Sequence, residues 1–287
     1  MLKDYDPELL KRIHNAELEV LNEFDNICKS NGLQYFAFAG TAIGAVRHGG
    51  FIPWDDDIDL GMLREDYEKL KKIVAEKEDY NFRITTPETE PEYCSSIIKF
   101  QQNDTQFVPP YAVKDNAKLG IHVDIFVYDR ISDDKKKAVK QIRKARRYAR
   151  LMFLRKYAHP EVPGTGLKAS VQRILCKVIH YALAVLHISP RWMFKKFQEN
   201  AQASNKEKTK YCTTFQSTKI ENCRVRKSEI FPLVDMKFED RTIPLLNGYD
   251  KSLTRIFGDY MVVPPKEKRI NHAPAIIKFA GEEPIVL

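Results

Sequence analysis

Apolar residues recur at helical or strand spacing along most of the chain, and their order predicts a fold of mixed α and β elements. The first pattern runs from Leu10 to Ile27 and predicts a helix that begins after Asp6 and ends at Asn31. Short alternating or β-branched apolar runs predict strands. We expect strands at residues 34–39, 57–63, 82–85, 95–101 and 121–128, and a hairpin at 236–239 and 242–245. Further helices are expected at 41–48, 64–78, 135–156 and 249–257.

Three aspartates lie where the second predicted strand begins. On a strand, Asp55, Asp57 and Asp59 point to one face, because alternate residues share a face. Carboxylates held together repel one another unless a cation lies between them, and oxygen ligands suit Mg²⁺ or Mn²⁺. An EF-hand loop that started at Asp55 would need glycine at Leu60 and glutamate at Asp66, so that pattern fails. The acidic run is a candidate metal site, with a solvated loop as the alternative.

A further aspartate, Asp124, lies in the middle of the apolar run 121–128. A carboxylate in a buried strand is costly unless it is paired, hydrogen-bonded or bound to a metal. If this strand lies beside the acidic one, Asp124 completes a triad with Asp57 and Asp59. The alternative is a structural aspartate that accepts hydrogen bonds from backbone amides.

A small-residue turn precedes the acidic run and offers a second candidate feature. Gly40 lets the backbone approach a ligand closely, and Thr41 can cap the predicted helix or donate its hydroxyl to phosphate. Arg47 and His48 follow at the end of that helix, and either is placed to meet a negatively charged donor. Lys99 lies inside an apolar run, where it either contacts phosphate or occupies the solvent face of a strand. For His48 the alternative is a surface histidine.

The combination of Gly-Thr, Asp-x-Asp and a later strand aspartate resembles the nucleotidyltransferase superfamily. The longer string at 39–59, AGTAIGAVRHGGFIPWDDDID, is similar to the LicD family, which includes bacterial phosphocholine transferases and the catalytic domains of the fukutin group. A C-terminal string, residues 249–261 followed by two prolines at 264 and 265, also resembles LicD proteins. The resemblance implies an α/β (α+β) fold with a nucleotidyltransferase-like mixed sheet flanked by helices; the middle of the chain matches nothing in the family, and its charge predicts a basic helical insertion.

The resemblance also implies a reaction. LicD-like proteins transfer a phospho-alcohol from a CDP-activated donor to a sugar hydroxyl, and their acceptors are often lipid-linked glycans. We therefore expect CDP-choline as donor and a cell-surface glycan, lipopolysaccharide or teichoic acid precursor as acceptor. Asp57 and Asp59 would hold Mg²⁺ or Mn²⁺, and Asp55 would add a ligand or orient a metal-bound water. Asp124 would share a metal and, unless a metal-bound group does so, take the acceptor proton.

The donor alcohol and the pocket that holds it are open at this stage. Choline would need aromatic faces, whereas ribitol or glycerol would need hydroxyl partners. The aromatic residues available for a choline site are Trp54, Tyr93, Tyr111, Phe126 and Tyr260. The residues that either build a donor or acceptor pocket or only pack the terminal helix are Tyr249, Asp259, Tyr260 and Arg269. Two other functions compete: a nucleotidyltransferase that moves a nucleoside monophosphate to a sugar, antibiotic or protein, and a noncatalytic basic binding module.

Charge is distributed unevenly over the 287 residues. Residues 135–198 contain 17 Lys or Arg and one acid, a balance of +16, so the rest of the chain carries 8 − 16 = −8. We expect a catalytic core at 1–132, a basic helical insertion at 133–208 and a C-terminal part at 209–287 that completes the catalytic domain. The insertion suits peripheral contact with an anionic membrane, a helical cap with a solvated basic face, or nucleic acid, in that order of preference.

Five scattered cysteines without a Cys-x-x-Cys motif argue against disulfides and a cysteine-rich zinc site. The chain opens with charged residues and not with an apolar leader. Both features predict a cytoplasmic protein, and membrane contact would place it at the inner face of the cell membrane. The sequence leaves the acceptor, the number of metal ions and the oligomeric state open.

Overall fold

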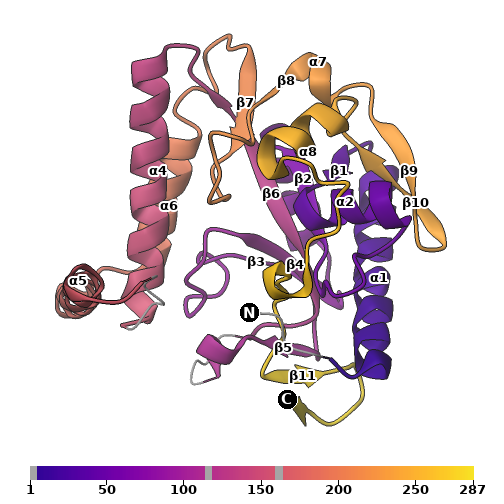
Figure 1. Cartoon of the computed structure of the whole chain (residues 1–287), viewed down its shortest axis with the longest axis horizontal. Coiled ribbons are helices and arrows are strands. Elements are labelled where there is room, and N and C mark those ends of the chain that lie inside the picture. The colour runs from indigo at the N-terminus through magenta and orange to yellow at the C-terminus, as the bar shows by residue number, and fades with distance from the viewer. Residues whose placement is uncertain (1–4, 114–117, 159–163) are drawn as a thin grey trace.

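A mixed sheet lies at the centre of the molecule. A computed structural model of the chain describes residues 5–113, 118–158 and 164–287 (Figure 1). The start of the charged N-terminal segment, residues 1–4, lies outside these ranges. The strands of the central sheet are β1 (Tyr35–Ala37), β2 (Asp59–Leu63), β3 (Phe82–Thr85), β4 (Ile98–Gln102), β6 (His122–Ile131), β7 (Tyr211–Thr214) and β8 (Val225–Arg226).

The strand order makes this sheet mixed. It runs β1-β2-β6-β4-β3, with β7 pairing β6 and β8 pairing β7. Only the β2–β6 pair is parallel among the described strand pairs, and the others are antiparallel. Helices cover the sheet, so the predicted fold class is confirmed. The helices that belong to the body of the molecule are α1 (Pro7–Ser30), α2 (Ala39–His48), α3 (Arg64–Ala75), α7 (Lys227–Ile230) and α8 (Tyr249–Phe257).

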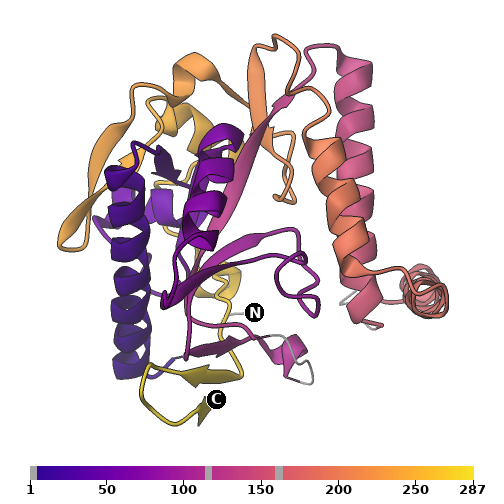
Figure 2. The same ribbon diagram turned by 180° about the vertical axis from the view of Figure 1, so that it is seen from behind.

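The long central strand β6 separates two apolar clusters. Val123 and Ile125 belong to the main core, which also contains the buried apolar residues of α1 and α3. These two helices lie together over one face of the sheet (Figure 2). Phe126 and Tyr128 belong to a second, smaller cluster. Because alternate strand residues point to opposite faces, Asp124 shares the face of Phe126 and Tyr128, away from α1 and α3.

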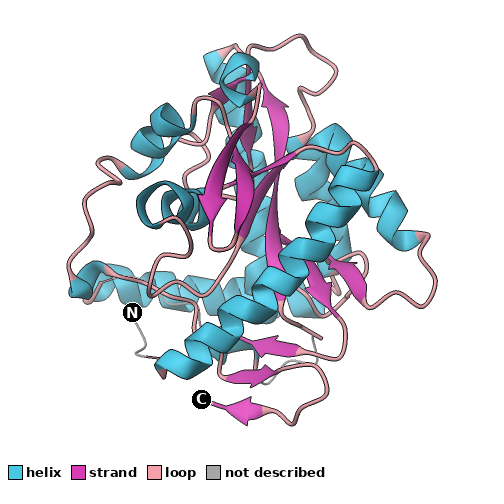
Figure 3. Cartoon of the chain, turned by 90° about the vertical axis from the view of Figure 1, so that its right-hand side faces the viewer, coloured by secondary structure: helices cyan, strands magenta, loops and turns pink. Residues whose placement is uncertain are grey.

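Smaller sheets flank the central one. The predicted hairpin forms as β9 (Val234–Phe238) and β10 (Arg241–Leu245). The strands β5 (Gln106–Val108), β11 (Ile276–Lys278) and β12 (Ile285–Val286) form a separate three-stranded sheet, seen at the bottom of Figure 3. Single-turn 3₁₀ helices lie at Pro110–Ala112 and Lys266–Lys268.

The segment between β6 and β7 is helical. It contains α4 (Lys135–Lys156), α5 (Leu167–Val185) and α6 (Pro190–Ala201). In Figure 1 α4 and α6 stand side by side at one edge, whereas α5 is seen along its own axis. The strands on either side of this segment pair directly, because Ile131 lies opposite Tyr211. The segment is therefore the connection of one antiparallel strand pair.

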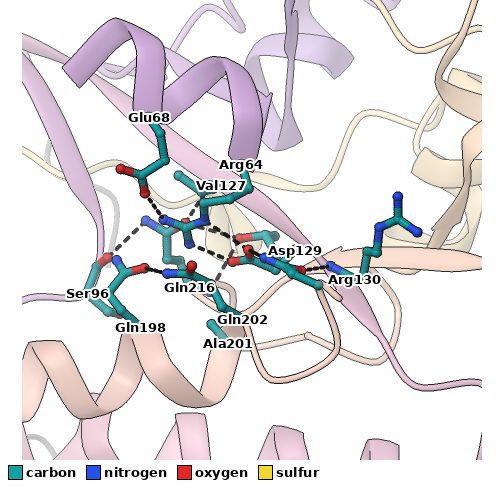
Figure 4. A network of polar contacts seen from close by, with 12 residues as sticks. Arg64, Glu68, Ser96, Val127, Asp129, Arg130, Gln198, Ala201, Gln202 and Gln216 are labelled. Atoms are coloured by element: carbon teal, nitrogen blue, oxygen red, sulfur yellow. Dashed lines mark hydrogen bonds and ion pairs between the residues drawn. The ribbon is translucent and has the colours of Figure 1, made fainter. Parts of the chain in front are cut away.

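A buried polar network links β6 to α3 and to the residues that follow α6. Arg64 donates from Nε and Nη2 to the two carboxylate oxygens of Asp129, at 2.9 and 2.6 Å (Figure 4). Asn205 donates to the same carboxylate at 2.7 Å. The side chain of Gln216 accepts from the backbone N–H of Val127 at 2.6 Å. The Asp129 side chain is only 1% exposed, so its charge is balanced by Arg64 and not by water.

Several predicted boundaries were wrong. The strand expected at 57–63 begins at Asp59, so Asp55 and Asp57 lie in the loop before it. The helix expected at 41–48 begins at Ala39, and α5 and α6 lie within the basic insertion, where no boundaries were predicted for them. The strands β5, β7, β8, β11 and β12 were not predicted. The five cysteines form no disulfide, as expected.

Candidate active site

The register of three neighbouring strands brings together residues that lie far apart in the sequence. Asp59 on β2 lies opposite Asp124 on β6, and Lys99 on β4 lies opposite Asp124 from the other side. Directly paired residues in a sheet project from the same face. Asp59, Asp124 and Lys99 therefore stand in a row across the face that α1 and α3 leave uncovered.

A hydrogen-bond network holds this row in place. The Lys99 ammonium donates to Asp124 Oδ1 at 2.6 Å and lies 2.6 Å from His122 Nε2. His122 Nδ1 lies 2.8 Å from the carbonyl oxygen of Gly120, which can only accept, so Nδ1 carries the proton and Nε2 accepts from Lys99. Burial and the neighbouring Lys99 charge lower the pKa of His122 to about 4. His122 is thus a neutral acceptor beside a charged lysine.

The loop before β2 adds a second group of ligand atoms. Asp55, Asp57 and His272 each offer one such atom, and these three atoms lie within 4.8 Å of one another. His272 Nδ1 lies 3.1 Å from Asp57 Oδ2. The buried carboxylate of Asp56 places His272, because it accepts from the His272 backbone N–H at 2.7 Å and also from the Tyr5 hydroxyl. One aspartate of the acidic run is therefore structural, while its two neighbours face His272.

The electrostatics of this cluster suit a bound cation. Burial and the charges of Asp57, Asp124 and Asp55 raise the pKa of Asp59 well above its usual range. Burial and the charges of its neighbours Asp57 and Asp56 raise the pKa of Asp55 in the same way. Burial alone would also raise the pKa of Asp57, but the hydrogen bond and the charge of His272 outweigh it and lower that pKa.

The partner of Asp57 shows the opposite shift. The hydrogen bond to Asp57 raises the pKa of His272 to about 9, so the protonated histidine balances part of the negative charge of the carboxylates. Oxygen ligands with an excess of negative charge are what Mg²⁺ and Mn²⁺ prefer. The donor set around Asp55 and Asp57 therefore fits a divalent cation, with the side chain of His272 within reach.

Gly40 and Thr41 support the acidic cluster from α2. A Cβ atom on Gly40 would lie 2.6 Å from Asp55 Oδ2, so the missing side chain makes room for that carboxylate. Thr41 Oγ1 accepts from the backbone N–H of Asp59 at 2.7 Å, and its side chain is buried. The expectation that Thr41 caps the helix was wrong, because the helix begins two residues earlier, at Ala39. Phosphate binding by either residue stays a prediction.

A cavity of about 670 Å³ lies above the row of strand residues. Asp57, Asp59, Lys99, His122, Asp124 and His272 line one part of it. Aromatic side chains line much of the rest: Phe38, Tyr93, Phe107, Tyr111, Phe126, Phe153, Tyr157 and Phe257. The cavity thus joins a charged floor to an aromatic wall, and α4 contributes to that wall through Phe153.

Several residues predicted for the site lie outside this cavity lining. Arg47 donates to the carbonyl oxygen of Tyr260 at 2.6 Å and to His48 Nε2 at 2.9 Å, and so ties α2 to the C-terminal part. Trp54 lies under the guanidinium of Arg269, with 4.1 Å between the guanidinium carbon and the ring centroid. Contact of a ligand with Arg47, His48 or Trp54 stays a prediction.

The C-terminal candidates pack around α8. The Tyr260 hydroxyl donates to Asp250 Oδ1 at 2.8 Å, and Tyr260 is buried. Tyr249 is partly buried against both apolar clusters, and Asp259 is exposed. None of the three lines the cavity. Of the two alternatives left open by the sequence, their placement favours packing of the terminal helix.

The sequence did not single out several residues that the fold brings to the site. His122 could have been recognised from its spacing, because it lies two residues before Asp124 on the same strand and so shares its face. His272 gave no signal, since it belongs to a segment without regular structure. Phe153 and Tyr157 lie on or just after α4, which the sequence marked only as basic. Glu17 on α1 is buried, and its Oε2 atom has no hydrogen-bond partner.

Comparisons with known proteins agree with the resemblance noted in the sequence. Residues 32–165 match the family model "LicD/FKTN/FKRP, nucleotidyltransferase domain". The chain is 31% identical over 263 residues to the lipopolysaccharide cholinephosphotransferase LicD of Haemophilus influenzae, which covers 89% of this chain and 92% of that protein. It is 45% identical over 47 residues to the human ribitol 5-phosphate transferase FKRP, covering 16% of this chain and 10% of that protein.

Proposed function

Because the chain belongs to the LicD family of transferases, we propose that it transfers phosphocholine from CDP-choline to a sugar hydroxyl of a cell-surface glycan precursor, with Mg²⁺ or Mn²⁺ as cofactor. The observation that carries the proposal is that Asp57, Asp59, Asp124 and Lys99 line the same cavity as an aromatic wall. A phosphorylated donor needs positive charge at its phosphates, and a quaternary ammonium needs aromatic faces.

The proposed roles follow from the positions of the side chains. Asp57, with Asp55 and Asp59 beside it, would hold the cation, which when bound neutralises charge on the donor's phosphoryl oxygens. Lys99 adds a fixed positive charge on the cavity floor. Asp124 accepts the proton of the acceptor hydroxyl in this proposal, since its carboxylate lines the same cavity and is held by Lys99. Catalysis would then rest on positioning and electrostatics.

The choice of choline over ribitol or glycerol rests on three rings at the cavity wall. The ring centroids of Phe153 and Tyr157 are 4.6 Å apart, those of Tyr111 and Tyr157 are 5.1 Å apart, and those of Tyr111 and Phe153 are 6.2 Å apart. A trimethylammonium group is attracted to such ring faces, whereas a polyol would need hydroxyl partners. Of the aromatic candidates from the sequence, Tyr93, Tyr111 and Phe126 line the cavity, and Trp54 and Tyr260 do not.

The test measures CMP release by mass spectrometry with CDP-choline, CDP-ribitol and CDP-glycerol, in the presence of Mg²⁺ or Mn²⁺ and sugar acceptors. We expect CMP from CDP-choline with the wild type and none with Asp59→Asn. The matched control is Glu78→Gln, which removes one exposed negative charge outside the cavity. Pyrophosphate release from a nucleoside triphosphate instead of CMP would favour the nucleotidyltransferase. Failure of every CDP-alcohol to bind would overturn the proposal.

A second measurement tests the donor alcohol separately. Phe153→Ala should weaken CDP-choline binding about tenfold, the equivalent of about 1.4 kcal/mol of cation–π attraction, and should leave CDP-glycerol binding nearly unchanged. Tyr181→Ala is the control, because that ring is exposed on α5 and does not line the cavity. Equal losses for both donors would refute choline recognition while leaving phospho-alcohol transfer intact.

A further inference from the structure

The helix α5 exposes a continuous apolar surface. Its exposed apolar residues lie between 55% and 83% accessible: Leu167, Val171, Ile174, Leu175, Val178, Tyr181 and Val185. At about 3.6 residues per turn these positions fall within about 120° of the helix circumference. We call them the α5 stripe. A stripe of this length facing water is unusual, because large exposed apolar patches mark interaction sites.

The opposite side of α5 is the side that holds it to the body. Ala169 and Leu183 are the buried residues of the helix, and both fall on the side away from the α5 stripe. His180 Nδ1 lies 2.9 Å from the carbonyl oxygen of Leu154 on α4. The helix is therefore attached along one face, and the α5 stripe is directed away from α4.

Positive charge borders the α5 stripe. Lys168, Arg173 and Lys177 lie on α5, which has no acidic residue. The neighbouring helix α4 adds eleven basic residues and no acidic one. On the N-terminal half of α4, away from Leu154 where α5 packs, a surface groove is lined by Val139 and by basic side chains only: Lys136, Lys140, Arg143, Lys144 and Arg147. An apolar face with basic flanks is the pattern of a helix that lies in the plane of an anionic bilayer surface.

We propose that α5 is an interfacial helix that docks the protein onto an anionic lipid bilayer through the α5 stripe. No single described helix is long and apolar enough to cross a bilayer, and α5 and α6 meet that criterion only as a pair bent by 109°. The buried residues of α6, among them Met193, Phe194 and Phe197, pack into the main core, so α6 is not available to the bilayer. The helix α5 therefore lies on the membrane and does not span it.

The same arrangement relates the membrane to the cavity. The helix α5 packs beside Leu154, and Phe153 and Tyr157 on either side of that residue line the cavity wall. Docking through α5 would hold that wall close to the lipid surface. The docking proposal does not depend on the donor or on the reaction, because vesicle binding is measured without either.

The charge and the apolarity of this surface favour lipid over two other occupants. Nucleic acid would use the basic side chains but gains nothing from the seven apolar side chains of the α5 stripe, since its affinity comes from phosphate contacts and stacking. A second copy of the chain would bring an equally basic surface against this one, and like charges repel. An anionic bilayer can bury the apolar side chains of the α5 stripe and pair its headgroups with the basic side chains beside it.

The experiment uses flotation of the whole protein with vesicles of phosphatidylglycerol and phosphatidylcholine, and with vesicles of phosphatidylcholine alone. The test variant is Val171→Glu/Val178→Glu. The matched control is Val262→Glu/Val286→Glu, which adds the same charge at two valines that are 63% and 79% exposed outside α5. Circular dichroism checks that both variants keep their helix content.

We expect the wild type and the control to float with anionic vesicles, and the α5 variant to partition at least tenfold less. Arg173→Gln/Lys177→Gln should bind more weakly than the wild type at low salt and approach it at about 0.5 M salt, where charge is screened. Three results would overturn the proposal: no flotation of the wild type with anionic vesicles at low salt, equal flotation of the α5 variant, or a dimer in sedimentation that the α5 variant dissociates and that binds no lipid.

Discussion

The carboxylate cluster should make the metal-free protein less stable than a variant with one charge fewer. Ligand atoms of Asp55 and Asp57 lie within 4.8 Å of each other. At an effective dielectric constant of about 20, two like charges at that distance repel by about 3 kcal/mol. The positive His272 beside Asp57 offsets part of this repulsion. We therefore expect Asp55→Asn to raise the free energy of unfolding by about 1–3 kcal/mol when metal is chelated.

The size of the effect in a melting experiment follows from chain length. An unfolding entropy of about 2.1 cal/mol/K per residue gives about 0.6 kcal/mol/K for 287 residues, so Tm should rise by about 2–5 °C. Metal at about a hundred times its Kd should stabilise the wild type by about 2.7 kcal/mol, or about 4–5 °C, and the variant much less. The assay is calorimetry with EDTA and with Mg²⁺ or Mn²⁺.

Two outcomes would refute this reasoning. A lower Tm for Asp55→Asn in EDTA would mean that the carboxylate makes favourable contacts that outweigh its repulsion. A metal-induced shift that is as large in the variant as in the wild type would place the cation elsewhere. Glu78→Gln serves as the control for loss of one negative charge, since Glu78 is exposed and lies far from the cluster in the sequence. It should change neither measurement.

Three further predictions concern the scaffold around the site. Asp129→Ala should lower stability by about 3–5 kcal/mol in denaturant unfolding, because it removes the buried acceptor of Arg64 Nε and Nη2 and leaves Arg64 only its ion pair with the half-exposed Glu68; a change below 1 kcal/mol would contradict the pairing. Gly61→Ala should lower stability by about 1–3 kcal/mol, since its Cβ would lie 2.0 Å from Phe36 Cε2, and an unchanged Tm would count against that close approach. Thr41→Val should cost about 1–3 kcal/mol by leaving the first N–H of β2 without its acceptor, and unaltered amide exchange at that position would refute it.

The sequence predicted the elements of the site better than their geometry. The buried aspartate on β6 and the acidic run before β2 were predictable, because a carboxylate in an apolar strand needs a partner. The sequence could not predict that Asp59 and Asp124 share one face, because this depends on the strand order. Hydrophobic periodicity does not reveal that order. The alternation argument failed for Asp55 and Asp57, since they lie in a loop. Their carboxylates are held near each other by the fold of that loop and not by strand pleating.

Long-range contacts account for most of what could not be predicted. His272 reaches Asp57 only because the C-terminal segment returns to the sheet, and the pairing of Ile277 with Phe107 is part of that return. No local pattern encodes such a contact. The role of Thr41 was hidden for another reason, since a threonine that holds a backbone N–H looks the same in sequence as one that caps a helix.

The connection from β6 to β7 has a consequence for how such proteins can diversify. Because Ile131 and Tyr211 are paired, everything between them leaves and rejoins the sheet at one point, and a short turn could close the same strands. This one segment carries two rings of the cavity wall, Phe153 and Tyr157, and the helix α5, whereas Asp59, Asp124 and Lys99 lie outside it. Exchange of that segment between relatives would replace part of the cavity wall and the exposed apolar face of α5 in a single event, and would leave Asp59, Asp124 and Lys99 unchanged.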